Sequence, residues 1–281
     1  MQVILGTAQL TRPYGVMEGK GENDRTRGNP EEVLRLAKDL GFEAIDTAPV
    51  YGRAEAEIGK SSVNLEIHTK LLPGLGSASS VEQSLSRLRR ARVDVVYLHE
   101  TLSLEREQQR LMFELAGLKG TKVGRIGVSI YDKKEFSLAM SSPLVDVIQV
   151  PYNVFDQRFG PQFLSEANKA GKRVLARSVF LQGVLLADPA ALPPPVQHLK
   201  ANVAQLRRIA QDWRLDPLTI ALAFVRANTG LSGIIVGSAK QKEMRDISQG
   251  FALDVPEELI QELRKQVWPV WQKTDPRRWL G

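Results

Sequence analysis

The sequence contains no cysteine among its 281 residues. Composition alone therefore excludes disulfide bonds, zinc–thiolate sites, iron–sulfur clusters and thiol nucleophiles. A chain without cysteine suits a reducing compartment, and we expect a cytoplasmic location.

Long hydrophobic runs are also missing. No apolar stretch approaches the roughly 20 residues that span a bilayer. The first residues, MQVILGTAQL, lack the basic segment that begins a secretory signal. We expect a protein that does not associate with membranes.

Aromatic residues make up only 6% of the chain, whereas the formal net charge is +6. A nucleic-acid-binding protein usually clusters its positive charge and interleaves it with aromatic rings that stack on bases. The densest basic runs here are short, RLRRAR at 87–92 and DPRRWL at 275–280. We therefore expect no nucleic-acid partner.

Short apolar segments of strand length alternate with longer segments of helical period along the whole chain. The expected strands are 3–8, 43–48, 65–71, 93–99, 125–130, 146–152, 173–180 and 232–237. The expected crossover helices are 29–41, 80–91, 105–119, 161–171 and 217–230. Caps support these helices: Asn29 precedes Pro30, Asp216 precedes Pro217, and Gly41, Gly171 and Gly230 are expected to close helices.

Eight strands alternating with helices, without a break in composition, predict an α/β fold, a (β/α)₈ TIM barrel forming a single domain over residues 1–281. A doubly wound sheet is the alternative. Residues 183–215 exceed one crossover and predict an inserted loop and helix after the seventh strand. The residues after Phe251 predict a final helix and a C-terminal arm over a barrel end.

Polar side chains stand where the second, third and fourth strands end. Asp46, Lys70 and His99 occupy these ends, and Tyr51 follows in the next loop. Because the carboxyl ends of barrel strands surround the substrate site, we expect the four side chains to converge. Few other carboxylates or histidines fall at strand ends, so we expect no metal site.

A phenol with an ammonium beside it suits one kind of chemistry. The ammonium of Lys70 would favour the phenolate form of Tyr51, and Asp46 would keep Lys70 charged and in place. His99 would hydrogen-bond the same reactive oxygen. Such a group suits proton donation to a carbonyl oxygen while hydride arrives at the carbonyl carbon.

The stretch DTAPVYGRAEAEIG, residues 46–59, resembles the signature of the aldo-keto reductases. TKL (69–71), VDVVYLH (93–99), RIGVS (125–129) and IQVPYN (148–153) resemble further motifs of that family, in the same order. The resemblance implies Asp46, Tyr51, Lys70 and His99 as a catalytic tetrad, with Tyr51 as general acid in carbonyl reduction. It also implies NADPH or NADH as cofactor, and Lys240 and Arg245 favour NADPH because they suit a 2′-phosphate.

The same resemblance implies a set of cofactor-binding residues. Ser129 and Gln149 match residues that hold the nicotinamide carboxamide, Arg177 replaces a common aromatic residue, and the loop SVFLQG at 178–183 would cover the pyrophosphate. The expected set is Ser129, Gln149, Arg177, Ser178, Leu181, Gly183, Gly237, Ser238, Lys240 and Glu243.

Alternative functions stay open at this point. GLGSAS at 74–79 resembles the fingerprint of a Rossmann-type dehydrogenase, with Glu100 at the end of the next strand. A barrel enzyme acting on a phosphorylated metabolite and a non-catalytic, nucleotide-sensing regulatory subunit are further alternatives. The favoured function is reduction of a small-molecule carbonyl substrate by a monomer or weak homo-oligomer.

Overall fold

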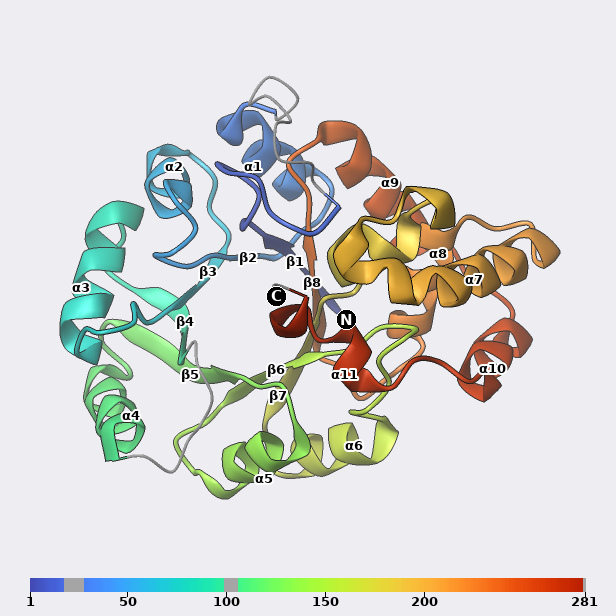
Figure 1. Ribbon diagram of the computed structural model, residues 1–281. Helices are drawn as coiled ribbons and strands as arrows, with labels where there is room; N and C mark the ends of the chain where they lie inside the picture. The colour runs from blue at the N-terminus through green and yellow to red at the C-terminus, as the bar shows by residue number, and fades with distance from the viewer. Residues whose placement is uncertain (18–27, 99–105, 280–281) are drawn as a thin grey trace.

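The computed structural model describes residues 1–17, 28–98 and 106–279. Its strands are all parallel and close into a barrel in the order β1 to β8, with helices around the outside (Figure 1). The strands are β1 (Gln2–Gly6), β2 (Ala44–Asp46), β3 (Glu66–Lys70), β4 (Val93–Leu98), β5 (Val123–Ser129), β6 (Val147–Pro151), β7 (Arg173–Arg177) and β8 (Gly233–Gly237). The (β/α)₈ prediction is confirmed, and the doubly wound sheet is excluded.

Alternate residues of each strand face the interior of the barrel, as the two-residue period of a strand requires. The interior cluster consists of Ile4, Ala44, Val95, Tyr97, Val147 and Leu175, with Ile235 packed against it. The register pairs Gly6 with Asp46 and Lys70 with Tyr97. Asp46 lies two residues beyond Ala44, so its side chain follows the interior row to the carboxyl end of the barrel.

The amino-terminal end of the barrel is filled by polar side chains. Arg173 donates from Nη2 to Gln2 Oε1 over 2.7 Å, and His68 Nε2 lies 3.6 Å from Glu66 Oε2. The neighbouring His68 lowers the pKa of the Glu66 carboxyl to about 2. Side chains thus close the amino-terminal end of the barrel interior. A ligand-binding site is therefore expected at the carboxyl-terminal end.

Two of the helices around the barrel begin with the predicted N-cap residues. Asn29 accepts a hydrogen bond from Glu31 N, and Asp216 accepts one from Thr219 N. The helices are α1 (Pro30–Asp39), α2 (Ala54–Lys60), α3 (Ser77–Leu88), α4 (Arg106–Leu118), α5 (Lys133–Ser141), α6 (Pro161–Lys169), α7 (Lys200–Asp212), α8 (Pro217–Arg226), α9 (Gln241–Ala252), α10 (Glu257–Lys265) and α11 (Trp271–Thr274).

Two of the three predicted closing glycines are right and one is wrong. Gly41 and Gly171 have φ of 82° and 72°, the left-handed conformation that follows a helix end. Gly230 does not close α8, which already ends at Arg226. A Cβ at Gly230 would run into Leu164, so close packing is what requires glycine there.

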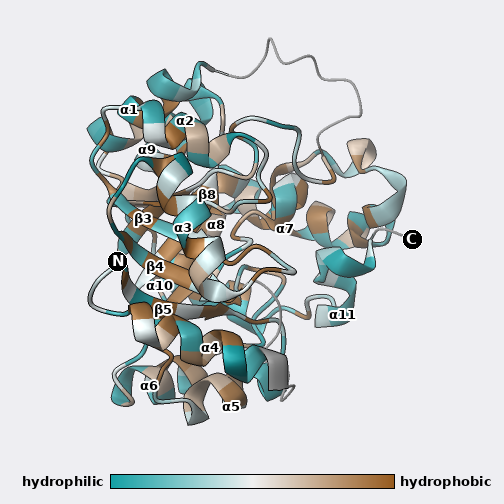
Figure 2. Ribbon diagram, turned by 90° about the vertical axis from the view of Figure 1, so that its left-hand side faces the viewer, coloured by the Kyte–Doolittle hydropathy of each residue, from teal (hydrophilic) through white to brown (hydrophobic). Residues whose placement is uncertain are grey.

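The inserted segment after β7 and the C-terminal arm are both present. The insertion contains the short helices η2 (Leu181–Leu186), η3 (Pro189–Ala191) and η4 (Pro194–Leu199) and then α7. The arm contains α11 and η5 (Pro276–Arg278). Figure 2 shows the N-terminus at one end of the barrel, and α7, α11 and the C-terminus toward the other. The insertion and the arm therefore lie at the same end of the barrel as the carboxyl ends of the strands.

The loop that resembles a dinucleotide fingerprint has a structural role instead. It follows β3 of the barrel, and its amide at Ser77 donates to the Glu114 carboxylate over 2.8 Å. Ser77 Oγ donates to Leu111 O over 2.7 Å. A carboxylate therefore occupies the helix start that would hold a phosphate, and the barrel excludes the Rossmann-type dehydrogenase.

None of the helices in the described ranges combines the length and the apolar character needed to cross a membrane. The organisation of residues 1–281 as one domain stays a prediction.

The barrel interior leaves no room for a side chain at position 127. Gly127 packs against the Tyr97 ring, and an alanine Cβ would overlap it. We expect Gly127→Ala to lower the free energy of unfolding by about 2 kcal/mol or more through overpacking. Urea denaturation followed by circular dichroism measures this loss.

Gly117→Ala is the matched control, because Gly117 lies in α4 and a Cβ there meets no described atom within 4 Å. Removing glycine from a helix should leave stability unchanged or raise it by up to about 1 kcal/mol. Equal effects of the two substitutions would show that barrel packing is not the cause.

Candidate active site

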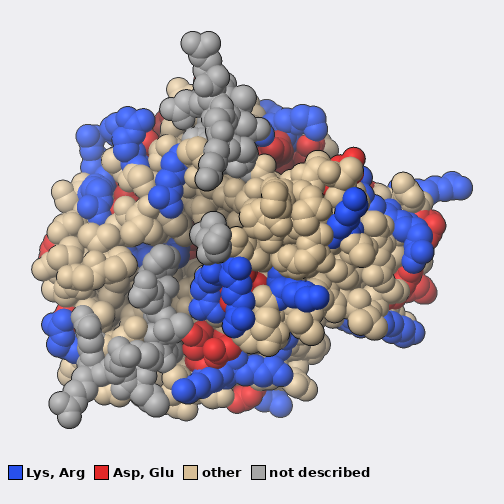
Figure 3. Space-filling model, viewed as in Figure 1, with Lys and Arg blue, Asp and Glu red and all other residues tan. Residues whose placement is uncertain are grey.

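A cavity of about 640 Å³ opens at the carboxyl ends of the strands. The predicted site residues that line it are Asp46, Tyr51, Lys70, Ser129, Gln149, Arg177, Ser178, Gly183, Gly237, Lys240 and Glu243. Figure 3 looks onto this end of the molecule and shows Lys and Arg side chains gathered near its middle. The structure thus brings most of the predicted residues to one place.

The centre of the cavity is a buried ion pair. Lys70 Nζ donates to Asp46 Oδ1 over 2.6 Å and to Thr47 O over 2.9 Å. Asp46 and Lys70 are each only 4% exposed. Burial disfavours the charged form of Lys70, but Asp46, with a smaller contribution from Tyr51, outweighs it and raises the pKa of the ammonium above its ordinary value. Lys70 is therefore a fixed positive charge.

Tyr51 lies directly against this charge. The Lys70 ammonium is 5.1 Å from the centroid of the Tyr51 ring, and the two side chains interact strongly enough to help raise the pKa of Lys70. The turn after β2 holds Tyr51 there, since Thr11 Oγ1 donates to Tyr51 O over 3.1 Å and Gly52 has a φ of 64°. Three of the four predicted catalytic residues therefore meet. His99 lies outside the described residues.

Gln149 completes the hydrogen bonding of the ion pair. Its amide nitrogen donates to Asp46 Oδ2 over 2.7 Å, so both carboxylate oxygens of Asp46 accept a hydrogen bond. Ser129 Oγ, on the neighbouring strand, accepts from Arg177 Nε over 3.1 Å. Both residues line the cavity above the interior cluster.

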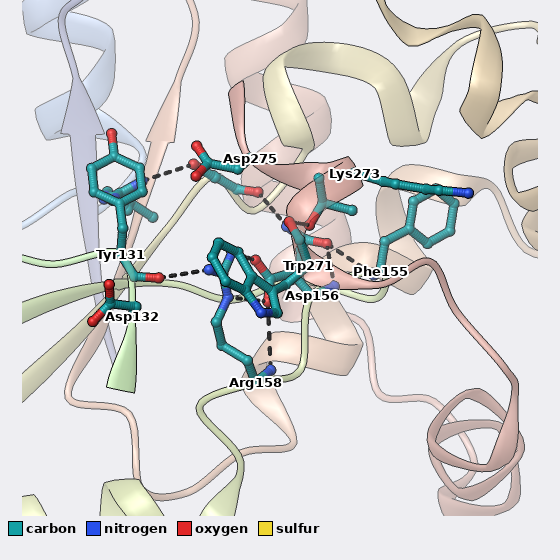
Figure 4. Close-up of polar contacts among 12 residues, drawn as sticks. Tyr131, Asp132, Phe155, Asp156, Arg158, Trp271, Lys273 and Asp275 are labelled. Atoms are coloured by element: carbon teal, nitrogen blue, oxygen red, sulfur yellow. Dashed lines mark hydrogen bonds and ion pairs between the residues drawn. The ribbon is translucent and has the colours of Figure 1, made fainter. Parts of the chain in front are cut away.

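Arg177 and the C-terminal arm enclose Tyr131. The guanidinium carbons of Arg177 and Arg277 lie 4.1 Å and 3.6 Å from the centroid of the Tyr131 ring. Arg158 donates to Tyr131 O, pairs with Asp156 and lies over the Trp271 ring, as Figure 4 shows. The arm is thus fixed to the wall of the cavity by stacked cations and aromatic rings.

Asp275 holds Arg277 in position within the C-terminal arm. It is 1% exposed, and its carboxylate accepts from Arg277 Nη2 over 2.7 Å and from Arg277 Nε over 3.0 Å. These hydrogen bonds outweigh burial and lower the pKa of the Asp275 carboxyl.

The loop after β7 carries backbone strain. Ser178, Leu181 and Gln182 have φ of 58°, 50° and 54°, a conformation that non-glycine residues rarely adopt, and Gly183 has 88°. Gln182 Oε1 accepts from Val16 N over 2.9 Å, which ties this loop to the one after β1. Strain of this kind concentrates at functional sites. Leu181 itself is buried and does not line the cavity.

The loop after β8 forms the far end of the cavity. Ser238 Oγ donates to Glu243 Oε2 over 2.8 Å and accepts from Lys240 N over 3.1 Å. Lys240 Nζ lies 3.3 Å from Glu243 Oε1, and both side chains are partly exposed. Ser238 is 2% exposed and shapes this loop without lining the cavity.

Among the cavity-lining residues that the strand-end analysis missed are Arg12, Tyr14 and Tyr131. Burial, and the proximity of Tyr51, raise the pKa of the Tyr14 phenol. Their one sequence signal is that each closely follows an expected strand, β1 or β5.

In the described ranges no group of three histidine, aspartate or glutamate side chains could hold a metal ion. A closed barrel whose open end holds a buried Asp–Lys pair against a tyrosine is the arrangement of the barrel oxidoreductases that the sequence motifs resemble.

Comparison with known proteins places the chain more closely. The model of the Aldo/keto reductase family matches residues 2–267. An uncharacterised oxidoreductase of Schizosaccharomyces pombe is 29% identical over 207 residues, which cover 67% of this chain and 74% of that protein. The aldo-keto reductase YhdN of Bacillus subtilis is 22% identical over 257 residues, covering 78% and 77%. The chain belongs to the aldo/keto reductase family and is an oxidoreductase.

Solved structures show the same fold. The glycerol dehydrogenase of Gluconobacter oxydans superposes with a TM-score of 0.71 at 22% identity, covering 93% of this chain and 90% of that one.

Removing the charge of Asp46 should reverse the pH dependence that Lys70 imposes. In the native protein the raised pKa of Lys70 keeps its contribution to stability intact up to its ordinary value of 10.5. In Asp46→Asn burial is opposed only by the smaller contribution of Tyr51, so we expect the pKa of Lys70 to fall below that value and folding to discharge the amine. We expect a loss of about 3–5 kcal/mol at pH 7, partly recovered by pH 9.5.

Urea denaturation at pH 7 and pH 9.5 measures this difference. Asp254→Asn is the control, since Asp254 is 98% exposed in its pair with Arg226 and should cost less than about 1 kcal/mol. A loss in Asp46→Asn that stays constant or grows with pH would contradict a charged, buried Lys70.

Proposed function

We propose that the protein reduces an aldehyde or ketone to an alcohol, reversibly, with NADPH or NADH as hydride donor and Tyr51 as general acid. The observation that carries the proposal is the contact between Tyr51 and the Lys70 ammonium, held in place by Asp46. A cytoplasmic monomer or weak homo-oligomer is part of the proposal.

The chemistry follows from the charge beside the phenol. Reduction places negative charge on the carbonyl oxygen, and Tyr51 neutralises it by donating its proton. The Lys70 ammonium stabilises the phenolate that is left behind. Lys70 donates to one carboxylate oxygen of Asp46 and Gln149 donates to the other. Because these side chains are already held in place, they need little reorganisation during the reaction. In alcohol oxidation the phenolate takes the proton back.

The cavity fits a nicotinamide dinucleotide in size and charge. Its volume of about 640 Å³ lies within the range of about 300–1,000 Å³ of small-molecule sites. Among the described residues, its lining carries four cations, Arg12, Lys70, Arg177 and Lys240, against the two carboxylates of Asp46 and Glu243. A positive lining suits the phosphates of such a cofactor.

The cofactor, when bound, supplies a hydride to the carbonyl carbon. Ser129 and Gln149 would hold its carboxamide near Tyr51, and Arg177 would lie against the nicotinamide. The loop from Ser178 through Leu181 to Gly183 would cover the pyrophosphate. Gly237, Ser238, Lys240 and Glu243 would form the end that binds the adenosine moiety.

Tyr51→Phe tests the acid directly. Phenylalanine keeps the ring against Lys70 but has no proton to donate, so we expect kcat for carbonyl reduction to fall about a thousandfold or more. Binding of NADPH, followed by quenching of tryptophan fluorescence, should persist. The assay is loss of reduced cofactor with a panel of aldehydes and ketones.

Tyr131→Phe is the matched control, because Tyr131 lines the same cavity but its ring stacks on Arg177 and Arg277 rather than on Lys70. Its effect should stay below tenfold. Full activity in Tyr51→Phe would remove the proposed acid. Cofactor binding without reduction of any carbonyl would favour the nucleotide-sensing regulatory subunit instead.

The preference for NADPH depends on Lys240. This side chain is partly exposed at the far end of the cavity, where it would pair with a 2′-phosphate. We expect Lys240→Met to raise the Kd for NADPH about tenfold and to change the Kd for NADH far less. Lys242→Met is the control, since Lys242 is 86% exposed and pairs with Asp246 outside the cavity. Equal changes for the two cofactors would contradict a 2′-phosphate site at Lys240.

A further inference from the structure

The loop after β1 carries a cation beside Tyr51 that no carboxylate in the described part of the chain neutralises. The Arg12 guanidinium carbon is 5.8 Å from the centroid of the Tyr51 ring, and Arg12 lines the cavity. Two positive charges therefore lie near the Tyr51 ring, the buried Lys70 and the exposed Arg12. Among the described residues, only Lys70 is matched by a carboxylate, that of Asp46.

Two cations of the cavity lining have carboxylate partners among the described residues. Asp46 neutralises Lys70, and Glu243 lies 3.3 Å from Lys240. Arg177 donates to Ser129 Oγ, Ile130 O and Ser178 Oγ and lies on the Tyr131 ring, so three of its five N–H donors are used within the protein. Arg12 has neither an ion pair nor a side-chain hydrogen bond to any residue in the described ranges.

The backbone around Arg12 is fixed relative to Tyr51. Thr11 Oγ1 donates to Tyr51 O over 3.1 Å and accepts from Arg53 N over 3.2 Å. At the other end of the same loop, Val16 N donates to Gln182 Oε1. These contacts hold the loop beside the proposed acid. The exposed Arg12 guanidinium can therefore donate hydrogen bonds to a ligand.

We propose that Arg12 binds an oxyanion of the substrate, so that the preferred substrates are carbonyl compounds carrying a carboxylate or a phosphate. This inference rests on the proposed function, because Tyr51 must address the carbonyl oxygen. An arginine fork binds carboxylate or phosphate through two parallel hydrogen bonds. Because Arg12 and Tyr51 are close, the oxyanion and the carbonyl are only a few bonds apart.

Matched substrate pairs test the proposal and separate the two oxyanions. Succinic semialdehyde against butanal reports on a carboxylate, and glyceraldehyde 3-phosphate against glyceraldehyde reports on a phosphate. We expect the native protein to prefer the charged member of at least one pair. Arg12→Met should lower that preference, as the ratio of kcat/KM values, about 10- to 100-fold and chiefly through KM.

Two further variants distinguish a specific contact with the Arg12 guanidinium from a general effect of positive charge. Arg53→Met removes an exposed arginine that follows Tyr51 closely but does not line the cavity, and it should keep the preference. Arg12→Lys retains the charge without the planar fork and should restore the preference in part. A preference lost equally in Arg53→Met would reduce the effect to general surface charge and overturn the proposal.

A binding measurement distinguishes failure of this inference from failure of the proposed function. Succinate and inorganic phosphate, which cannot be reduced, should raise the melting temperature of the native protein but not that of Arg12→Met. That result without any carbonyl reduction would leave the oxyanion site standing and remove the reductase. Carbonyl reduction with no charge preference, or an Arg12→Met defect confined to the Kd for NADPH, would overturn the oxyanion site and leave the reductase.

Discussion

The arrangement of the carboxyl-terminal end of the barrel depends on a buried ion pair, the Lys70 ammonium and the Asp46 carboxylate. Moving two charges out of water costs several kcal/mol each, and their attraction repays this only when the remaining hydrogen-bonding groups are satisfied. Thr47 O accepts from the ammonium, and Gln149 donates to the second carboxylate oxygen. Closure of the barrel brings β2, β3 and β6 together to do this. The fold and the proposed chemistry therefore depend on the same contacts.

Long-range contacts build the rim around that pair. The loops after β1 and β7 meet through Val16 and Gln182, which are 166 residues apart in sequence. The C-terminal arm reaches the wall through Arg277 and Tyr131. The rim thus combines segments from both ends of the chain, and strained backbone at Ser178 is held by Asn153, whose amide donates to Ser178 O over 3.0 Å.

The sequence predicted the parts of the molecule that have a period. Strand alternation and the rule that barrel sites lie at the carboxyl ends of strands were enough to bring Asp46, Tyr51 and Lys70 together. The sequence analysis did not predict Arg12 and Tyr131, because both lie in loops. A loop has no periodic pattern, and its conformation depends on contacts with residues distant in sequence. The glycine pattern misled at Gly230, where packing against Leu164 rather than a helix end requires glycine. The catalytic roles of Asp46, Tyr51, Lys70 and His99 stay predictions, as does the cofactor-binding set.

Gln149 shows how cofactor and acid would be coupled under the proposed function. Its amide nitrogen donates to Asp46 Oδ2, and the same amide interacts with the Tyr97 phenol. Beneath it lies Tyr97, whose phenol pKa is raised by burial and then by Asp46, and which therefore stays neutral. A carboxamide bound to Gln149 would orient the same amide that orients Asp46. Under the proposed function, cofactor binding would then fix the position of Asp46. Through Asp46 it would fix the Lys70 ammonium beside Tyr51 before the proton is donated.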